Sequence, residues 1–217
     1  FLEHRLFEKP EGDISERFTD IGADVDAQTG FNSTSFSVTC GPEGFAAAIE
    51  LLFELAGRVH FPEASVSRER SIVGHEIQLF EDNVEWMSFQ TMLGALYPGQ
   101  RIAVDIAGTA QSLLGIDAAM LERCHRNRYH ASAVQIFACG PLDVEELATN
   151  CNRALRSWPN RSDMAPRVAW AEARPGVRTV SMSLPRTRRM LAFPDEIPHQ
   201  GLALMRHELA MEMTLDI

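Results

Sequence analysis

The sequence lacks the features that mark several large classes of protein. It has no surplus of positive charge, because 20 Lys and Arg residues face 30 Asp and Glu residues, for a formal net charge of -10. Nothing therefore indicates a nucleic-acid-binding surface. The longest apolar stretch, residues 44–57, is interrupted by Glu50 and Glu54 and cannot span a bilayer. We expect neither nucleic acid nor a membrane among the partners of this chain.

Closely spaced cysteines are absent as well. The four cysteines, Cys40, Cys124, Cys139 and Cys151, lie far apart and form no CxxC pair. This spacing is typical of reduced, mostly buried thiols in a reducing compartment and not of a disulfide framework. We recognise no signal peptide, and we expect a cytoplasmic protein.

Both ends of the chain lack the usual signals of a terminus. Phe1 is neither a methionine nor a helix-capping residue. Residues 199–217 carry a helical stripe of apolar residues, which stops without Gly, Pro or a basic last turn. We expect that the chain is truncated at both ends and belongs to a longer protein.

The expected elements indicate an α+β fold. One long helix is expected to be capped by Ser65 or Ser67 and to run to about Tyr97. The elements follow no regular βαβ rhythm, which favours a mostly antiparallel sheet packed with helices on one side. The shorter helices are expected at 12–21, 42–59, 117–129 and 142–157, and the strands at 33–40 and 132–140.

The composition also predicts where the domains divide. Residues 159–176 are rich in Pro and polar residues, which is typical of a linker. We therefore expect one domain over residues 1–158. Residues 177–217, where apolar and polar residues again alternate, are expected to begin a following domain.

Four charged or polar side chains could form a site. Glu3 and His4 are adjacent, and Glu69 and Glu76 lie seven positions apart, so they share one face of a helix. A carboxylate on a face with apolar neighbours needs a partner, and a metal ion would be one. The alternatives are a solvated helix face and ion pairs with Arg68 or Arg70. His75 lies about 100° around the helix from Glu76, and we interpret it as a surface or structural residue.

Three segments of the sequence resemble the pitrilysin family of zinc metallopeptidases, the inverzincins. That family has an H-x-x-E-H motif on a helix, then a Gly-Ala-x-x-Asn-Ala-x-Thr segment, then a Glu on a second helix. FLEHRLFE at residues 1–8 matches the first motif except for its leading His, which would directly precede Phe1. GADVDAQT at 22–29 and RERSIVGHEI at 68–77 match the other two. Residues 112–143 also resemble a later helix–strand–Gly segment of these enzymes, so the resemblance covers nearly the whole chain.

The resemblance implies a role for each matched residue. His4 and Glu76 would be zinc ligands and Glu3 the general base, while Glu69 would orient a ligand His. The spacing suits this chemistry, because two His at i and i+4 on one helix can bind the same ion. Zinc lowers the pKa of a bound water to about 7, which makes hydroxide available at neutral pH.

The matched residues of the second segment would lie beside the substrate. Asp26, Ala27 and Thr29 are expected near the cleft, where an edge strand can pair with an extended peptide. Asp26 stands where the family has Asn, so the amide donor of that position is lost here.

The resemblance thus implies a pitrilysin-type half-domain that hydrolyses oligopeptides or small unfolded proteins with a zinc cofactor. Residues 1–158 would be most of the N-terminal catalytic domain. A homodimer, or a heterodimer with a related subunit, is the expected assembly. The chain itself is expected to bind zinc poorly and to be inactive, because only two protein ligands remain in it. The alternative is a catalytically inactive partner or scaffold subunit of a pitrilysin-type pair.

Overall fold

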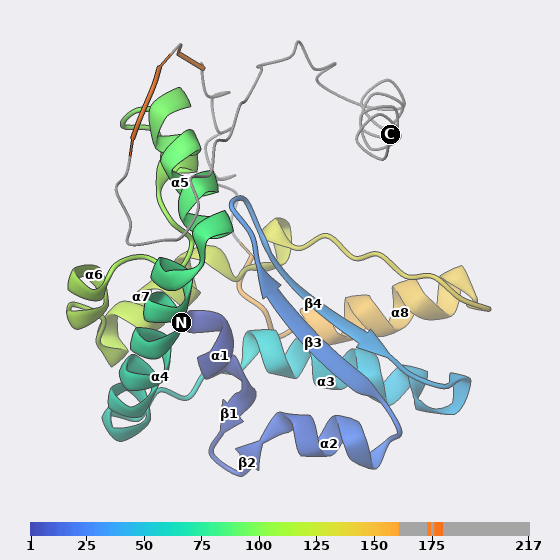
Figure 1. Ribbon diagram of the computed structural model, residues 1–217. Coiled ribbons are helices and arrows are strands. Elements are labelled where there is room, and N and C mark those ends of the chain that lie inside the picture. Colours follow the sequence, from blue (N-terminus) through green and yellow to red (C-terminus); the bar gives the residue numbers. More distant parts are fainter. Residues whose placement is uncertain (161–172, 175, 180–217) are drawn as a thin grey trace.

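A computed structural model describes residues 1–160, 173, 174 and 176–179 of the chain. Most of the expected linker and nearly all of the expected second domain lie outside these residues. Within them, helices predominate and the strands form two small antiparallel pairs (Figure 1). The expected α+β class with antiparallel strands and helices on one side is confirmed.

The N-terminal part of the chain builds the centre of the fold. It runs through α1 (Leu2–Phe7), the short strands β1 (Glu8–Lys9) and β2 (Gly12–Asp13), and α2 (Ile14–Asp20). The helix expected at 12–21 therefore begins at Ile14, because the side chain of Asp13 caps it by accepting a hydrogen bond from the N–H of Ser15.

The strand expected at 33–40 is one arm of a hairpin. β3 (Asp24–Thr29) pairs with β4 (Thr34–Thr39), with Val25 opposite Val38 and Ala27 opposite Phe36. Alternate residues of β4 are half-buried and exposed, as the alternating sequence predicts. The hairpin lies across α3 (Phe45–Gly57), which follows a short 3-10 turn at Pro42–Gly44 (Figure 1).

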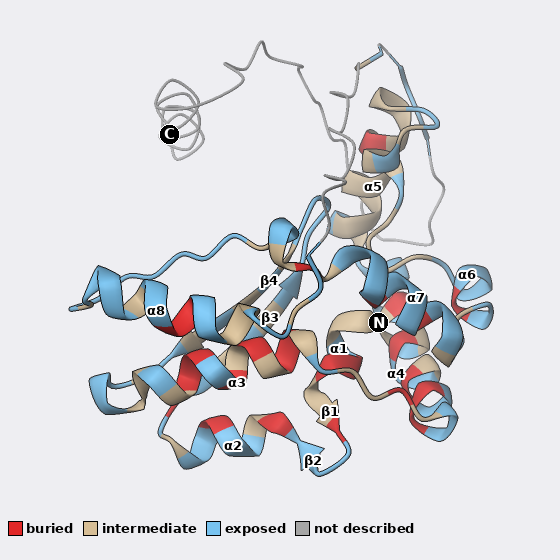
Figure 2. Ribbon diagram, turned by 180° about the vertical axis from the view of Figure 1, so that it is seen from behind, coloured by how far each residue is buried: buried red, intermediate tan, exposed pale blue. Residues whose placement is uncertain are grey.

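The main hydrophobic core lies between the hairpin and the helices of the first half of the chain. Figure 2 shows buried residues on the facing sides of α1, α2 and α3 and on the next helix, α4 (Glu63–Asp82). The fully buried members of this core include Leu6, Phe18, Leu55 and Val66. The backbone of α1 is thereby held against α3 and α4, which determines where Glu3 and His4 lie.

The long helix expected from Ser65 or Ser67 to Tyr97 is in fact two helices. α4 starts after Pro62 and ends at Asp82, and α5 (Val84–Leu96) follows after Asn83. The helix is interrupted there because the Asn83 side chain accepts hydrogen bonds from the N–H groups of Glu85 and Trp86, which caps the start of a new helix. The expected serine cap is wrong: Ser65 lies inside α4 and is buried.

The second half of the described chain is mostly helical. After a 3-10 turn at Arg101–Ala103 come α6 (Ala110–Leu114), α7 (Ala118–Arg128) and α8 (Val144–Leu155). The helices expected at 117–129 and 142–157 are confirmed by α7 and α8.

The strand expected at 132–140 is not formed. A 3-10 turn occupies Ala131–Ala133, and residues 134–139 have no strand partner among the described residues. Phe137 is 88% exposed and Ile136 is 44% exposed, although both belong to an apolar run. An apolar sequence needs a neighbouring strand before it can form a ladder, and no described strand is hydrogen-bonded to this segment.

The cysteines are less buried than the sequence indicates. All four are free thiols, but Cys124 and Cys139 are exposed and only Cys151 is buried. Across the helices that the structure describes, none is long and apolar enough to cross a membrane.

Candidate metal and catalytic site

Two helices supply the four side chains that the sequence analysis singled out. Glu3 and His4 lie on α1, and Glu69 and Glu76 lie on α4. The next two residues of α1, Arg5 and Leu6, are buried and anchor the helix, which leaves the side chain of His4 38% exposed. Tertiary packing therefore brings together residues that are far apart in the sequence.

His4 and Glu69 are in direct contact. The distance between His4 Nδ1 and Glu69 Oε1 is 2.8 Å, across 65 positions of sequence. Because an ionised carboxylate only accepts hydrogen bonds, Nδ1 is the protonated nitrogen, and Nε2 keeps the lone pair that can bind a metal. Glu69 is buried, and it pairs with neither Arg68 nor Arg70, the two partners considered from sequence.

The carboxylates of α4 also act on the charge of His4. The hydrogen bond to Glu69 raises the pKa of His4, whereas burial and the positive N-terminus lower it. The charges of Glu69 and Glu76 raise this pKa further, so Glu76 lies within electrostatic reach of the imidazole. Glu76 itself is half-buried, and its neighbour His75 is exposed, as expected for a surface residue.

The donor set fits zinc in kind but is incomplete in number. An imidazole with a carboxylate on its other nitrogen, together with a second carboxylate, is a typical part of a zinc site. Within the described part of the chain, no group of three or more His, Cys, Asp or Glu side chains is gathered closely enough to hold a metal. A catalytic zinc site uses three protein ligands, and His4 and Glu76 are two side chains of the kind that could serve as such ligands.

Glu3 is held by the hairpin. The hydroxyl of Thr29, at the end of β3, donates a hydrogen bond to Oε2 of Glu3. Thr29 was expected beside the substrate, and the structure places it in contact with the proposed general base. The other two residues of that segment lie nearby on β3, with Asp26 exposed and Ala27 half-buried.

Sequence reasoning missed a buried polar chain behind His4. Arg5 Nη1 lies 2.6 Å from Oε2 of Glu8 and 3.8 Å from Oε2 of Glu69. The hydroxyl of Ser65 donates a hydrogen bond to the other oxygen of Glu8. Arg5 is only 4% exposed, and its Nε and Nη2 atoms have no hydrogen-bond partner among the residues that the structure describes. The spacing of Arg5 and Glu8 at i and i+3 was the one signal in the sequence.

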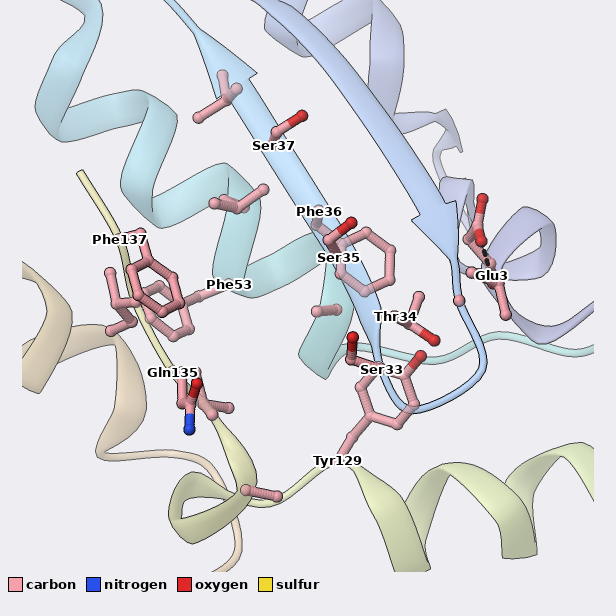
Figure 3. A pocket seen from close by; sticks show the side chains of 18 of the residues that line it. Glu3, Ser33, Thr34, Ser35, Phe36, Ser37, Phe53, Tyr129, Gln135 and Phe137 are labelled. Atoms are coloured by element: carbon pink, nitrogen blue, oxygen red, sulfur yellow. Dashed lines mark hydrogen bonds between the residues drawn. The ribbon is translucent and has the colours of Figure 1, made fainter. Parts of the chain in front are cut away.

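A wide groove opens beside the hairpin. It has a volume of about 3300 Å³ and lies between β4 and the extended residues 134–139, with α3 along its floor. Figure 3 shows Phe36, Phe53 and Phe137 in it, and Glu3 at one end. The ring centroids of Phe36 and Tyr129 are 6.4 Å apart. The groove is therefore largely apolar and reaches the candidate site.

Comparison with known proteins gives a consistent result. Residues 1–110 match the model of the family described as insulinase, peptidase family M16. The chain is 28% identical over 223 aligned residues to the uncharacterised zinc protease YmfH of Bacillus subtilis. This alignment covers 100% of the chain and 51% of YmfH, so the chain spans about half the length of that relative.

Solved structures show the same fold. The chain is similar to an M16-like peptidase from Alicyclobacillus acidocaldarius, with a TM-score of 0.67 and 28% identity, over 74% of this chain and 38% of that one. It is also similar to a domain from Pseudomonas fluorescens described as a peptidase M16 inactive domain. That match has a TM-score of 0.68 and 22% identity, and it covers 76% of this chain and 42% of that domain.

Proposed function

The chain belongs to the insulinase family, peptidase family M16, and we propose on this premise that it is part of a zinc-dependent peptidase. The observation that carries the proposal is the contact of 2.8 Å between His4 on α1 and Glu69 on α4. It joins an imidazole to the carboxylate that we propose orients it, next to Glu3 on the same helix, and the charge of Glu76 raises the pKa of this imidazole. Several relatives of the chain are zinc proteases by name, YmfH among them.

We propose the following roles for the residues of the site. His4 and Glu76 would hold the zinc ion, and in the full-length protein a His directly before Phe1 would be the third ligand. Glu69 keeps the imidazole of His4 oriented by accepting its Nδ1 proton. When bound, the zinc ion lowers the pKa of a water molecule to about 7.

Glu3 then acts as the general base. Its carboxylate accepts a proton from the water that attacks the peptide carbonyl, and later passes the proton to the departing amine. The Thr29 hydroxyl, which donates to Oε2 of Glu3, holds this carboxylate in place. Protonation turns the amine nitrogen into a leaving group, so that the C–N bond can break.

An extended peptide is the substrate class that the surroundings favour. The β3–β4 hairpin has strand edges with no partner among the described residues, and β3 carries Asp26 and Ala27 beside the candidate site. An edge strand binds an extended peptide through main-chain hydrogen bonds, whatever the side chains are. We therefore propose oligopeptides or unfolded segments as substrates.

We also propose a partner and a compartment. Because the chain spans about half of YmfH, a second, related half or subunit would enclose the substrate.

The described cysteines are all free thiols, which supports a reducing compartment such as the cytoplasm.

The test is Glu3→Gln in the full-length protein, incubated with a mixture of unstructured oligopeptides. We expect peptide cleavage to fall by roughly 10²- to 10⁴-fold, the usual contribution of a general base, while the bound zinc is retained. Glu16→Gln is the matched control, because Glu16 is an exposed residue of α2. Cleavage that persists in Glu3→Gln, or that resists phenanthroline, would contradict the proposed mechanism.

The second candidate is a subunit that does not cut. In its favour, the described residues gather no group of three or more His, Cys, Asp or Glu side chains that could hold a metal. The similar domain from Pseudomonas fluorescens, described as inactive, has the same fold, so the fold alone does not decide between the two functions. Sequencing the residue before Phe1 separates them, because any residue other than His leaves the site without its third ligand.

A further inference from the structure

Three members of the buried polar chain behind His4, namely Ser65, Glu8 and Arg5, have no role in the function proposed so far. It runs from the Ser65 hydroxyl through Glu8 and Arg5 to Glu69, which contacts His4. Arg5 and Glu69 are 4% and 7% exposed, so water does not stabilise their charges. Three secondary-structure elements contribute to it, namely α1, β1 and α4.

The two oxygens of Glu69 are used for different contacts. Oε1 accepts the hydrogen bond from His4, and Oε2 faces Arg5 Nη1 at 3.8 Å. The guanidinium is itself fixed by Glu8 at 2.6 Å, and Glu8 is fixed by Ser65. A carboxylate held at both oxygens cannot rotate about its terminal bond without losing a contact.

We propose that Arg5 is a positioning residue, which holds the Glu69 carboxylate in the orientation that presents His4 to the metal. This inference rests on the proposed zinc-peptidase function and assigns a new residue to it. Arg5 does not touch the substrate or the metal. It acts through Glu69, and Glu8 and Ser65 hold Arg5 in turn.

Packing alone does not explain an arginine at this position. An apolar side chain of similar length would fill the same space and would leave no donors unpaired, whereas Nε and Nη2 of Arg5 have no partner among the described residues. Replacing a whole buried ion pair by apolar residues is often neutral or stabilising, whereas removing only one of the partners is destabilising. Because only Nη1 contacts the carboxylates, a single ammonium group could replace the guanidinium.

The test compares Arg5→Met and Arg5→Lys in the full-length protein. Zinc affinity is measured by competition with a chromophoric chelator, and the absorption spectrum of the Co²⁺-loaded protein reports the ligand geometry. We expect Arg5→Met to weaken zinc by about 10-fold, the lower end of what the loss of an outer-shell partner causes, because Arg5 acts on His4 only through Glu69, and to change the Co²⁺ spectrum. Arg5→Lys should restore most of the affinity.

The matched control is Arg17→Met, because Arg17 pairs with Glu54 at 2.8 Å on the surface, away from the site. It should leave zinc affinity unchanged. The melting temperature of the metal-free protein is measured in parallel, and a fall in zinc affinity without a fall in this temperature separates positioning from a structural role.

Two results would overturn the inference. If Arg5→Met binds zinc as tightly as the wild type does, only the role of Arg5 is overturned. If the wild-type protein itself binds no zinc, the proposed zinc-peptidase function is overturned as well. Should Arg5→Met not fold, Glu8→Gln is measured instead, because it keeps the volume of Glu8 and removes the charge that fixes Arg5. We expect weaker zinc binding there too, and an unchanged affinity would equally overturn the inference.

Discussion

At the scale of single residues, His125 shows how burial changes the charge of a side chain. It is 8% exposed, its Nε2 lies 2.7 Å from the carbonyl oxygen of Ala56, and its ring stacks on Tyr129 with centroids 4.6 Å apart. Burial lowers the pKa of His125, the hydrogen bond to Ala56 raises it, and the nearby charge of Lys9 lowers it. In the folded chain this imidazole therefore stays neutral as the pH falls through 6.5, its usual pKa.

This predicts an acid-sensitive contribution to stability. As the pH falls below 6.5, the unfolded chain binds a proton at His125 and the folded chain does not, so the free energy of unfolding decreases. We expect His125→Gln to lose this part of the decrease, because Gln does not titrate. The Gln side chain can still donate a hydrogen bond to the carbonyl of Ala56, so the folded state keeps that contact. Urea titrations of both proteins between neutral and mildly acidic pH measure it. Parallel curves for the two proteins would contradict the prediction.

At the scale of elements, the C-terminal end of α3 is stabilised from outside the helix. α3 has no basic residue in its last turn, where a cation would offset the helix dipole and satisfy free carbonyls. Lys9 from β1 supplies the positive charge that the last turn of α3 lacks. Its Nζ donates to the carbonyl oxygen of Leu55 at 2.9 Å and to that of Arg58, and burial lowers its pKa to about 8.

We predict that Lys9→Met destabilises the protein by about 1–3 kcal/mol, because two buried carbonyl groups lose their donor. The measurement is chemical denaturation at pH 7.

In the wild type, the free energy of unfolding should rise between about pH 8 and the ordinary Lys pKa of 10.5, since only the folded chain releases the Lys9 proton in that window. Lys9→Met should lack this rise, and a variant as stable as the wild type would show that the contacts contribute nothing.

At the scale of the whole molecule, the groove beside β4 leaves apolar side chains in water. Phe137 is 88% exposed on one wall, and the floor is formed by apolar residues of α3 such as Phe53 (Figure 3). Large exposed apolar surfaces promote self-association of a chain. Because Phe137 buries little area, it contributes little to the stability of this chain.

We predict that Phe137→Asp reduces self-association of the 217-residue chain and changes its free energy of unfolding by less than about 0.5 kcal/mol, as surface substitutions usually do. Light scattering against concentration measures the first effect. Leu114→Asp is the control, because Leu114 on α6 is 73% exposed and does not line the groove. Equal effects of both substitutions would mean that the groove has no special part in association.

Local patterns in the sequence are sufficient to predict most of the elements. The alternation in β4 and the apolar stripes of α3, α7 and α8 are periodic over their full length, and each forms the expected element. Two wrong predictions, one continuous helix to Tyr97 and a strand at 132–140, depend on interactions that the apolar pattern does not report. Asn83 separates α4 from α5 through its own side chain, and residues 134–139 form no strand because no strand among the described residues pairs with them.

The sequence by itself determined the family, the α+β class and the residues that could carry chemistry, because motifs and periodicity are properties of neighbouring positions along the chain. Only the tertiary structure decided the contacts of those residues. It placed Glu69 on His4, Thr29 on Glu3, and Arg5 behind Glu69. Such contacts join residues up to 65 positions apart, and they depend on how α1 packs between the hairpin and α4. No local pattern contains that information.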